Sequence, residues 1–337
     1  MSMRSILIKQ FGGIENLIIG SAPKPIPKNN EILVQVKSFA LNRADVLQRM
    51  GRYPPPPGDS EILGLEMSGV VVEADKQDKR FKIGDKVFGL VGGGAYGEFC
   101  TIASNQAFHM PSHLTFESAS AIPEAWLTAF QALHPLANFK SGNSVLIHAA
   151  ASGVGTALIQ LCKVDGATKI FGTVGSDEKA KFIEKLGATH SINYKTNENF
   201  LDVINDITSK KGVNNVFDYV GAKYWNQNLK SLSMDGVMII QGFLSGSHIK
   251  DTTADITPIL GKRLTIKGST LRNRDNDYKA DLVSQFSKRY LGLFESGELK
   301  PVVDKVFNYS EIKEAHEYLE ANKNMGKVVI KGFSYSE

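Results

Sequence analysis

A run of small residues stands near the middle of the 337-residue chain, where the sequence pattern changes. Residues 145–147 are Val-Leu-Ile, residues 149–155 are Ala-Ala-Ala-Ser-Gly-Val-Gly, and residues 156–163 carry apolar side chains at helical spacing. Small residues let a backbone approach a pyrophosphate closely, and a following helix offers N–H groups and the positive end of its dipole. The pattern therefore predicts a dinucleotide-binding turn.

The turn departs from the common spacing G-x-G-x-x-G. Ala150 and Ser152 stand at the first two glycine positions, and Gly155 keeps the third. Two interpretations of Ser152 stay open: its hydroxyl contacts nicotinamide or phosphate, or the residue serves only because it is small.

The end of the next predicted strand bears on the choice of coenzyme. Residues 169–174 are followed by Gly175 and Ser176, where folds that prefer NAD usually place an acid to accept from the ribose hydroxyl. This favours a 2′-phosphate, with Lys179 as a source of positive charge. Two alternatives stay open: Ser176 is simply the N-cap of the next helix, which is compatible with a phosphate contact, or Asp177 is the ribose ligand, which favours NADH.

Two different patterns divide the chain. Residues 4–120 read as short β-rich runs separated by Gly, Pro, Asn and Asp, whereas strands and helices alternate from about residue 126 to 268. Such alternation predicts a doubly wound parallel sheet with its site at the carboxyl ends of the strands. We expect an α/β protein with domains at 1–125 and 126–268, and residues 269–337 returning to the first domain.

Composition narrows the class of protein. The net charge is +4, and Lys and Arg never run longer than two, so we expect no nucleic-acid partner. Two cysteines cannot form a disulfide framework or a cysteine zinc site. No run of 18 apolar residues and no leader pattern is present, so we expect no membrane partner and a cytoplasmic location.

Three further segments join the turn in a family resemblance. The motifs are residues 142–155 with Gln160 and Lys163, residues 41–56 containing Asn-Arg-Ala-Asp, residues 64–69, and the closing segment 322–327. Together they resemble the zinc-free quinone oxidoreductases (zeta-crystallin-like) of the medium-chain dehydrogenase/reductase superfamily, closest to the tumour-suppressor-inducible quinone oxidoreductase subgroup.

The resemblance implies a GroES-like β domain, a Rossmann domain that binds NADPH, and a homodimer or homotetramer. In its pattern Lys179 and Tyr194, with Ser176 and Gly175 nearby, contact the 2′-phosphate, and Ala151, Ser152, Gly153, Val154 and Gly155 form the pyrophosphate turn. The residues that it places around the nicotinamide half are Thr128, Gly242, Phe243, Leu244 and Leu271, with Asn322 in a closing loop. Asn42 and Tyr53 lie at the mouth of the substrate site, and Leu47 replaces a second tyrosine of some relatives.

A catalytic zinc is not expected. Asn42 stands where zinc relatives have their first cysteine ligand, and Leu65 replaces the histidine of their Gly-His-Glu motif. Without a metal the acceptor must itself be electrophilic, as a quinone bound in the interdomain cleft is. Negative charge that develops on its oxygen needs a donor: the Asn42 amide, the Tyr53 hydroxyl or a water.

The predicted activity is an NADPH-dependent quinone reductase. Two alternatives stay open: an NADPH-dependent enone or enoyl reductase, and a non-catalytic NADPH-binding protein with a structural or RNA-binding role. His148 is expected to be a core histidine, and residues 92–94 a hairpin connection. Residues 235–241 and 264–268 are expected to pair across a two-fold axis.

Overall fold

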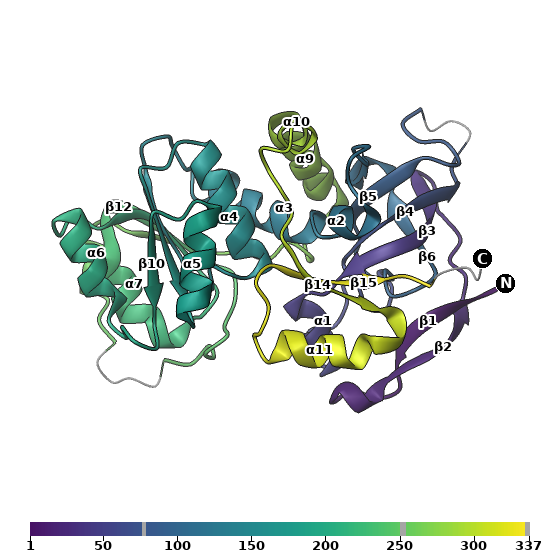
Figure 1. Ribbon diagram of the computed structural model, residues 1–337, viewed down its shortest axis with the longest axis horizontal. Helices are drawn as coiled ribbons and strands as arrows, with labels where there is room; N and C mark the ends of the chain where they lie inside the picture. Colours follow the sequence, from purple (N-terminus) through teal and green to yellow (C-terminus); the bar gives the residue numbers. More distant parts are fainter. Residues whose placement is uncertain (76–78, 250–253, 334–337) are drawn as a thin grey trace. The chain divides into compact units, whose positions relative to one another are not determined.

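The computed structural model describes residues 1–75, 79–249 and 254–333. The described chain forms two compact units, one from Met1–Leu127 and Arg272–Glu337 and the other from Thr128–Leu271. Figure 1 shows the elements of each. The chain crosses between the units at 127/128 and 271/272, against the boundaries of 125/126 and 268/269 expected from the sequence.

The first unit is built on a seven-stranded sheet. Its strand order is β14-β15-β3-β4-β5-β7, and β6 pairs with β3. The strands are β3 (Glu31–Ala40), β4 (Glu66–Glu73), β5 (Lys86–Leu90), β6 (Phe99–Ala103), β7 (Ala107–His109), β14 (Val303–Asn308) and β15 (Lys327–Lys331). A separate hairpin is formed by β1 (Ser2–Ile8) and β2 (Leu17–Pro23). The carboxyl-terminal strand β15 is thus an interior strand of this sheet.

Helices of both chain segments cover this sheet. They are α1 (Arg43–Arg49), α2 (Phe116–Ser120), α3 (Pro123–Gln131, which crosses into the second unit), α9 (Asn276–Phe286), α10 (Gly292–Glu295) and α11 (Ile312–Glu320). The core joins apolar side chains of β3, β4 and β15 to Ile312 and Leu319 of α11. Residues 54–57, which are four prolines, lie outside every helix and strand, because proline fixes φ and lacks a backbone N–H.

The second unit is a six-stranded parallel sheet with helices on both sides. Its strands are β8 (Ser144–Ile147), β9 (Lys169–Val174), β10 (His190–Asn193), β11 (Val213–Asp218), β12 (Leu232–Ile240) and β13 (Thr265–Gly268). Its main helices are α4 (Gly153–Val164), α5 (Asp177–Leu186), α6 (Phe200–Thr208), α7 (Trp225–Ser231) and the short α8 (Thr257–Gly261). In Figure 1, α4 and α5 lie on one side of the sheet and α6 and α7 on the other.

The strand order in this sheet is β10-β9-β8-β11-β12-β13, and every pairing is parallel. The order reverses between β8 and β11, which is where doubly wound folds bind their ligands. The expected doubly wound sheet is therefore confirmed.

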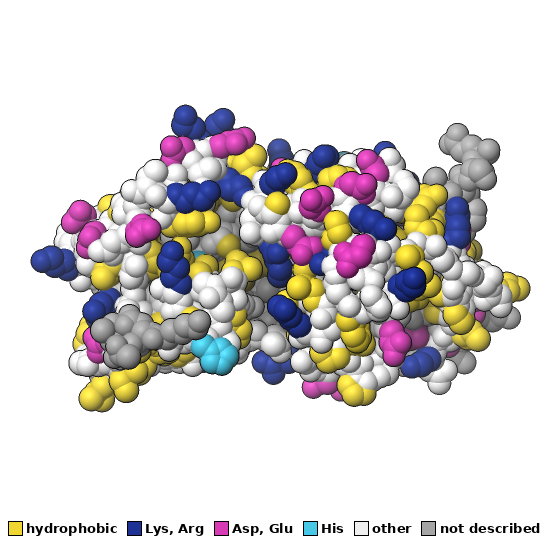
Figure 2. All heavy atoms as spheres, turned by 90° about the horizontal axis from the view of Figure 1, so that it is seen from below, with side chains coloured by type: hydrophobic (Ala, Val, Ile, Leu, Met, Phe, Trp, Pro, Cys, Tyr) yellow, Lys and Arg dark blue, Asp and Glu magenta, His cyan; other side chains and the backbone are white. Residues whose placement is uncertain are grey.

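Two features of the surface are plain. No helix in the parts of the chain that the structure describes is long and apolar enough to cross a membrane. Figure 2 shows Lys and Arg side chains interspersed with Asp and Glu on the face drawn, so neither sign of charge dominates that face.

Candidate functional site

The turn after β8 is held by close backbone packing. Ala149 has a left-handed φ of 47°, and the Ser152 hydroxyl caps α4 by accepting from the Gly155 amide at 3.1 Å. A Cβ on Gly155 would lie 2.6 Å from the Ala149 carbonyl oxygen, so only glycine lets the helix approach the strand this closely. The first N–H groups of α4, from Gly153 onward, therefore stand at the carboxyl end of β8.

The end of β9 forms a second small-residue position. Ser176 caps α5 by accepting from the Lys179 amide at 3.2 Å. A Cβ on Gly175 would lie 2.6 Å from the hydroxyl oxygen of Tyr194, which shows how closely that phenol covers the glycine. The Asp177 carboxylate accepts from the Asn193 side chain at 2.7 Å. Gly175, Ser176, Lys179 and Tyr194 are thus brought together, and Asp177 is engaged by its neighbour.

Of the residues expected around nicotinamide, Gly242, Phe243 and Leu244 follow β12, Thr128 lies on α3, and Leu271 follows β13. Gly242 packs on Tyr219, and the Leu244 amide donates to the Tyr219 carbonyl at 3.0 Å. The carbonyl of Thr128 accepts from Gln241 at 3.3 Å. Phe243 and Leu244 are exposed by 57% and 52%, whereas Leu271 is buried. Two large apolar side chains thus stand in solvent at the edge where a ligand is expected.

His148 is a buried core histidine, as the sequence predicts. Its Nε2 lies 2.7 Å from Asn228 Oδ1 and its Nδ1 lies 2.9 Å from the Thr173 hydroxyl. Asn228 donates its amide to Asp218 at 3.2 Å, so its oxygen is an acceptor and the proton of His148 is on Nε2. Burial lowers the pKa of His148, which keeps the ring neutral. The network ties β8, β9, β11 and α7 together beneath the turn.

In the first unit, Asn42 is part of a buried charge network. The Lys327 ammonium lies 2.6 Å from the Asn42 amide oxygen, 2.6 Å from a Glu66 carboxylate oxygen and 2.8 Å from the Leu41 carbonyl. The Asn42 amide nitrogen donates to Glu66 at 2.8 Å. Both ends of the amide are therefore engaged inside the protein, and Asn42 is 8% exposed.

Asp45 fixes the start of α1 beside this network. Its carboxylate accepts from the Asn42 and Gly64 amides at 2.7 and 3.1 Å. Burial raises the pKa of Asp45 to about 6, against the lowering effect of these hydrogen bonds and of Lys327. Gly64 has a φ of 102°, and a Cβ there would meet Ala95 and Tyr96 at 2.7 Å, so a side chain is excluded.

Tyr53 lies beside a cation. The Arg272 guanidinium carbon is 5.5 Å from the centre of the Tyr53 ring. Burial raises the pKa of the Tyr53 hydroxyl, and no described residue forms a hydrogen bond to it. Asn322, with a φ of 53°, accepts from Arg43 at 2.6 Å. The predicted residues Asn42, Tyr53 and Asn322 belong to the first unit, and the other predicted residues belong to the second.

Sequence reasoning did not single out four charged residues of the first unit: Asp45, Arg272, Lys279 and Lys327. The signal for Lys327 is its place at the head of the apolar strand 328–330, where a charge implies a buried partner. Arg272 and Lys279 carry no comparable signal, because a charged residue in a mixed helix or loop ordinarily lies at the surface.

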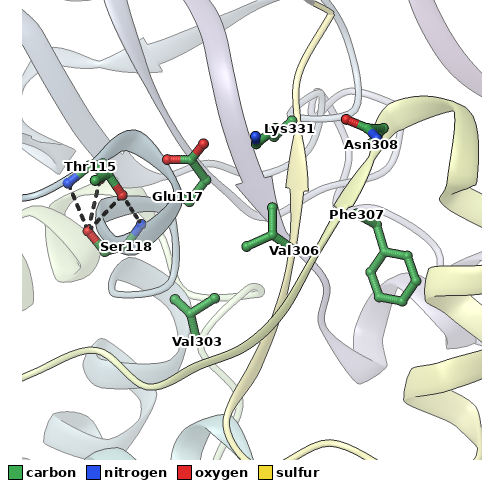
Figure 3. A pocket seen from close by; sticks show the side chains of 8 residues that line it. All are labelled: Thr115, Glu117, Ser118, Val303, Val306, Phe307, Asn308 and Lys331. Carbon is green, nitrogen blue, oxygen red and sulfur yellow. Dashed lines mark hydrogen bonds between the residues drawn. The ribbon is translucent and has the colours of Figure 1, made fainter.

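A surface cavity of about 440 Å³ lies against α2, β14 and β15 (Figure 3). Its lining residues are Thr115, Glu117, Ser118, Val303, Val306, Phe307, Asn308 and Lys331. It contains none of the predicted site residues, so we do not place the site there.

No metal centre is evident in the described residues. Among residues 1–75, 79–249 and 254–333, no three His, Cys, Asp or Glu side chains are grouped as ligands of one ion would be. At Asn42, the position of a zinc ligand in zinc relatives, the group in contact is the Lys327 ammonium.

Comparison with known proteins defines the class. Residues 28–112 match the alcohol dehydrogenase GroES-like domain, and residues 153–288 match the family described as zinc-binding dehydrogenase. The expected GroES-like domain is therefore confirmed, and the two-domain fold is that of a medium-chain dehydrogenase/reductase.

Two relatives narrow this class. A rat quinone oxidoreductase is 30% identical over 97% of both chains. The rat synaptic vesicle membrane protein VAT-1 homolog is 30% identical over 97% of this chain and 84% of its own. The chain belongs to the zinc-free, quinone oxidoreductase-like family of medium-chain dehydrogenases/reductases.

Solved structures agree with this assignment. Mycobacterial Rv1454c complexed with NADPH matches with a TM-score of 0.86 at 27% identity, over 98% of this chain and 99% of that one. The JamJ enoyl reductase matches with a TM-score of 0.85 at 28% identity, over the same shares. An NAD-dependent alcohol dehydrogenase matches with a TM-score of 0.86 at 30% identity, over 98% of this chain and all of that one. The chain is thus a member of an oxidoreductase family in which solved relatives are described with NADPH and as NAD-dependent.

Proposed function

We propose that this protein is an NADPH-dependent quinone oxidoreductase. The observation that carries the choice of coenzyme is the end of β9, where Gly175, the capping Ser176 and the Tyr194 hydroxyl stand in place of an acidic residue. NADPH, when bound, supplies the hydride that reduces the acceptor.

The residues of the second unit fit this coenzyme. The close packing at Gly155 brings the start of α4 against the strand end, which suits a pyrophosphate. At β9, Asp177 is engaged by Asn193, so the ribose-acid alternative has a competing partner. Lys179 follows Ser176 on the first turn of α5 and supplies positive charge for the 2′-phosphate.

For the acceptor, the first unit offers fewer donors than the sequence suggests. The Asn42 amide is engaged by Lys327 and Glu66, so we propose that Asn42 positions the start of α1 instead of donating to the acceptor. The Tyr53 hydroxyl has no partner among the described residues, and its raised pKa keeps the proton on oxygen. We therefore assign the donation to the acceptor oxygen to Tyr53 or to a water that it holds.

The test is the initial rate of NADPH and NADH oxidation with a small ortho-quinone and a small para-quinone. The Lys179→Met variant should raise the KM for NADPH about tenfold or more and leave that for NADH unchanged, because only NADPH carries the phosphate. Lys181→Met is the matched control, since it removes the same charge from an exposed position of the same helix. Equal use of both coenzymes by the wild type would instead support Asp177 as the ribose ligand.

A second candidate is an NADPH-dependent enone or enoyl reductase, which the similarity to an enoyl reductase supports. Turnover of a 2-enoyl thioester or an activated enone without turnover of quinones would favour it. Tight NADPH binding with no turnover of any acceptor would favour the non-catalytic role.

Three further properties remain part of the proposal: a homodimer or homotetramer, a cytoplasmic location, and no nucleic-acid partner. The mixed charge of the face drawn in Figure 2 supports the last of these. Salt-dependent retention on immobilised RNA would contradict it.

A further inference from the structure

Arg272 is a buried cation, and one of its guanidinium nitrogens forms no hydrogen bond. Its Nε and Nη2 both donate to the Gly92 carbonyl, at 3.1 and 2.9 Å. The residue is 7% exposed, and its Nη1 is buried with no hydrogen-bond partner. A buried donor on a charged group costs free energy unless an acceptor is supplied, so this nitrogen indicates a missing ligand atom.

Another segment of the chain packs closely on the loop whose Gly92 carbonyl binds Arg272. A Cβ on Gly92 would lie 2.4 Å from the Asp59 carboxylate, and one on Gly93 would lie 2.5 Å from the Ser60 carbonyl. Glycine at both positions therefore lets the segment from Asp59 pack directly on this backbone. The Gly92 carbonyl fixes two of the three guanidinium nitrogens, which leaves Nη1 in a defined direction.

A second buried cation lies near the first. Lys279, on the first turns of α9, is 6% exposed and forms no ion pair with the described residues. Burial lowers the pKa of Lys279, the charge of Asp59 raises it, and the charge of Arg272 lowers it again. Among the described residues, neither Arg272 nor Lys279 forms a salt bridge with a carboxylate.

Tyr53 gives this region an aromatic wall. Its ring lies against the Arg272 guanidinium, and the same charge lowers the pKa of its hydroxyl against the effect of burial. An aromatic ring beside two cations suits a ligand that is itself a flat ring with an anionic substituent.

We propose that Arg272 and Lys279 bind an anionic group, a carboxylate or sulfonate, carried by the acceptor. This rests on the proposed reductase function and narrows its substrate class to negatively charged quinones. The anion supplies the acceptor that Arg272 Nη1 lacks, and the Tyr53 ring packs on the acceptor ring. Because Nη1 is covered in this structure, the side chains above it move aside when the acceptor binds.

The test compares 1,2-naphthoquinone with its 4-sulfonate, using NADPH, in wild type and variants. Arg272→Met and Lys279→Met should each lower the ratio of kcat/KM for the sulfonate to kcat/KM for the neutral quinone about tenfold or more. Comparing the ratio of the two quinones between variants cancels their different intrinsic reactivity. Lys288→Met is the control, because it removes a charge from an exposed position of the same unit.

Arg272→Lys guards against loss of folding, since it keeps the charge but loses the paired donors. Its kcat/KM should lie between those of wild type and Arg272→Met for the sulfonate and not for the neutral quinone. A ratio of kcat/KM for the sulfonate to that for the neutral quinone that is the same in wild type, Arg272→Met and Lys279→Met overturns the proposal. Equal losses with both quinones also overturn it, because they assign these residues to general donation or to folding.

A binding measurement separates this proposal from the proposed function. Calorimetric titration of 2-naphthoate, which is not an acceptor, into the protein with NADPH should show binding that weakens about tenfold or more in Arg272→Met. This result supports the anion site even if neither quinone is reduced, in which case only the quinone reductase activity fails. No binding of 2-naphthoate to the wild type overturns the anion site while leaving neutral quinones as substrates.

Discussion

At the scale of single residues, Lys327 is the cation that offsets the free-energy cost of burying the Glu66 carboxylate. Replacing Lys327 by Met leaves Glu66, which is fully buried, without its partner. We expect the variant to lose about 3–5 kcal/mol of unfolding free energy from the first unit, measured by urea unfolding. The double variant with Glu66→Gln should recover part of this loss because no uncompensated charge remains. Lys331→Met, an exposed change on the same strand, is the control, and an equal effect of the two lysines would contradict this account.

His316 makes stability depend on pH. Burial lowers its pKa to about 3, with Arg49 adding to the effect, while its Nε2 lies 2.9 Å from the Tyr96 hydroxyl. Between about pH 6.5 and 3, His316 is protonated in the unfolded chain and neutral in the folded protein, so stability falls as the pH falls through this range.

Asp45 acts in the opposite direction. The pKa of Asp45 in the folded protein, about 6, exceeds the ordinary value of 3.8. Its contribution to the unfolding free energy is therefore present at low pH and is lost as the pH rises through 6. Urea unfolding from pH 4 to 7.5 should therefore show a less positive slope of stability against pH in His316→Gln and a more positive slope in Asp45→Asn, relative to wild type. The same slope in all three proteins would exclude both assignments.

The sequence indicated residues whose role is local and missed those whose role is set by distant partners. Ser152 and Ser176 cap helices that follow them directly, so their neighbours along the chain are enough. Lys327 donates to Asn42, which lies 285 positions earlier in the chain. A single sequence does not show that the two residues are close in space. The place of Lys327 at the head of an apolar strand implies a buried partner but does not say which residue that partner is.

At the scale of elements, the turn after β9 is sensitive to a single added methyl group. Gly175→Ala places a Cβ 2.6 Å from the Tyr194 hydroxyl, which must then move. We expect the KM for NADPH to rise severalfold, with a smaller change for NADH, measured by steady-state kinetics. Gly261→Ala, whose Cβ meets nothing within 4 Å, is the control and should behave like wild type. A larger effect on NADH would place the 2′-phosphate elsewhere.

Regular elements of the second unit were predictable because each has a strong period. The predicted strand at 169–174 is β9, with the same bounds, and the helix predicted after Ser176 is α5. By contrast, the sequence pattern does not delimit β14, Val303–Asn308. This strand lies at the edge of its sheet, and exposed charged side chains interrupt the apolar pattern.

At the scale of the whole molecule, β13 is one of the two edge strands of the parallel sheet. Among the described residues it pairs with β12 alone, so its other side can pair with the same strand of a second copy. Thr265→Lys should convert the expected dimer to monomer, because a two-fold axis brings the two new charges together. Light scattering after size-exclusion chromatography measures this, with the exposed Thr196→Lys as control. A wild-type protein that is already monomeric would contradict the expected pairing.

The fold class could be read from the sequence because it rests on continuous segments. The alternation of strands and helices after residue 126 is a local pattern that the parallel sheet confirms. The surroundings of Tyr53 could not be read, because Arg272 comes from a segment more than two hundred residues away and its partner is a backbone carbonyl.

The interior position of β15 has a consequence for the newly made chain. Residues 38–40 of β3 pair with β15, and Glu66 pairs with Lys327, so the sheet of the first unit cannot be completed until residue 331 has left the ribosome. All six strands of the second unit lie within Thr128–Leu271 and are available earlier. The first unit therefore completes its sheet after the second, and until then an open sheet edge and an unpaired carboxylate are exposed to molecular chaperones.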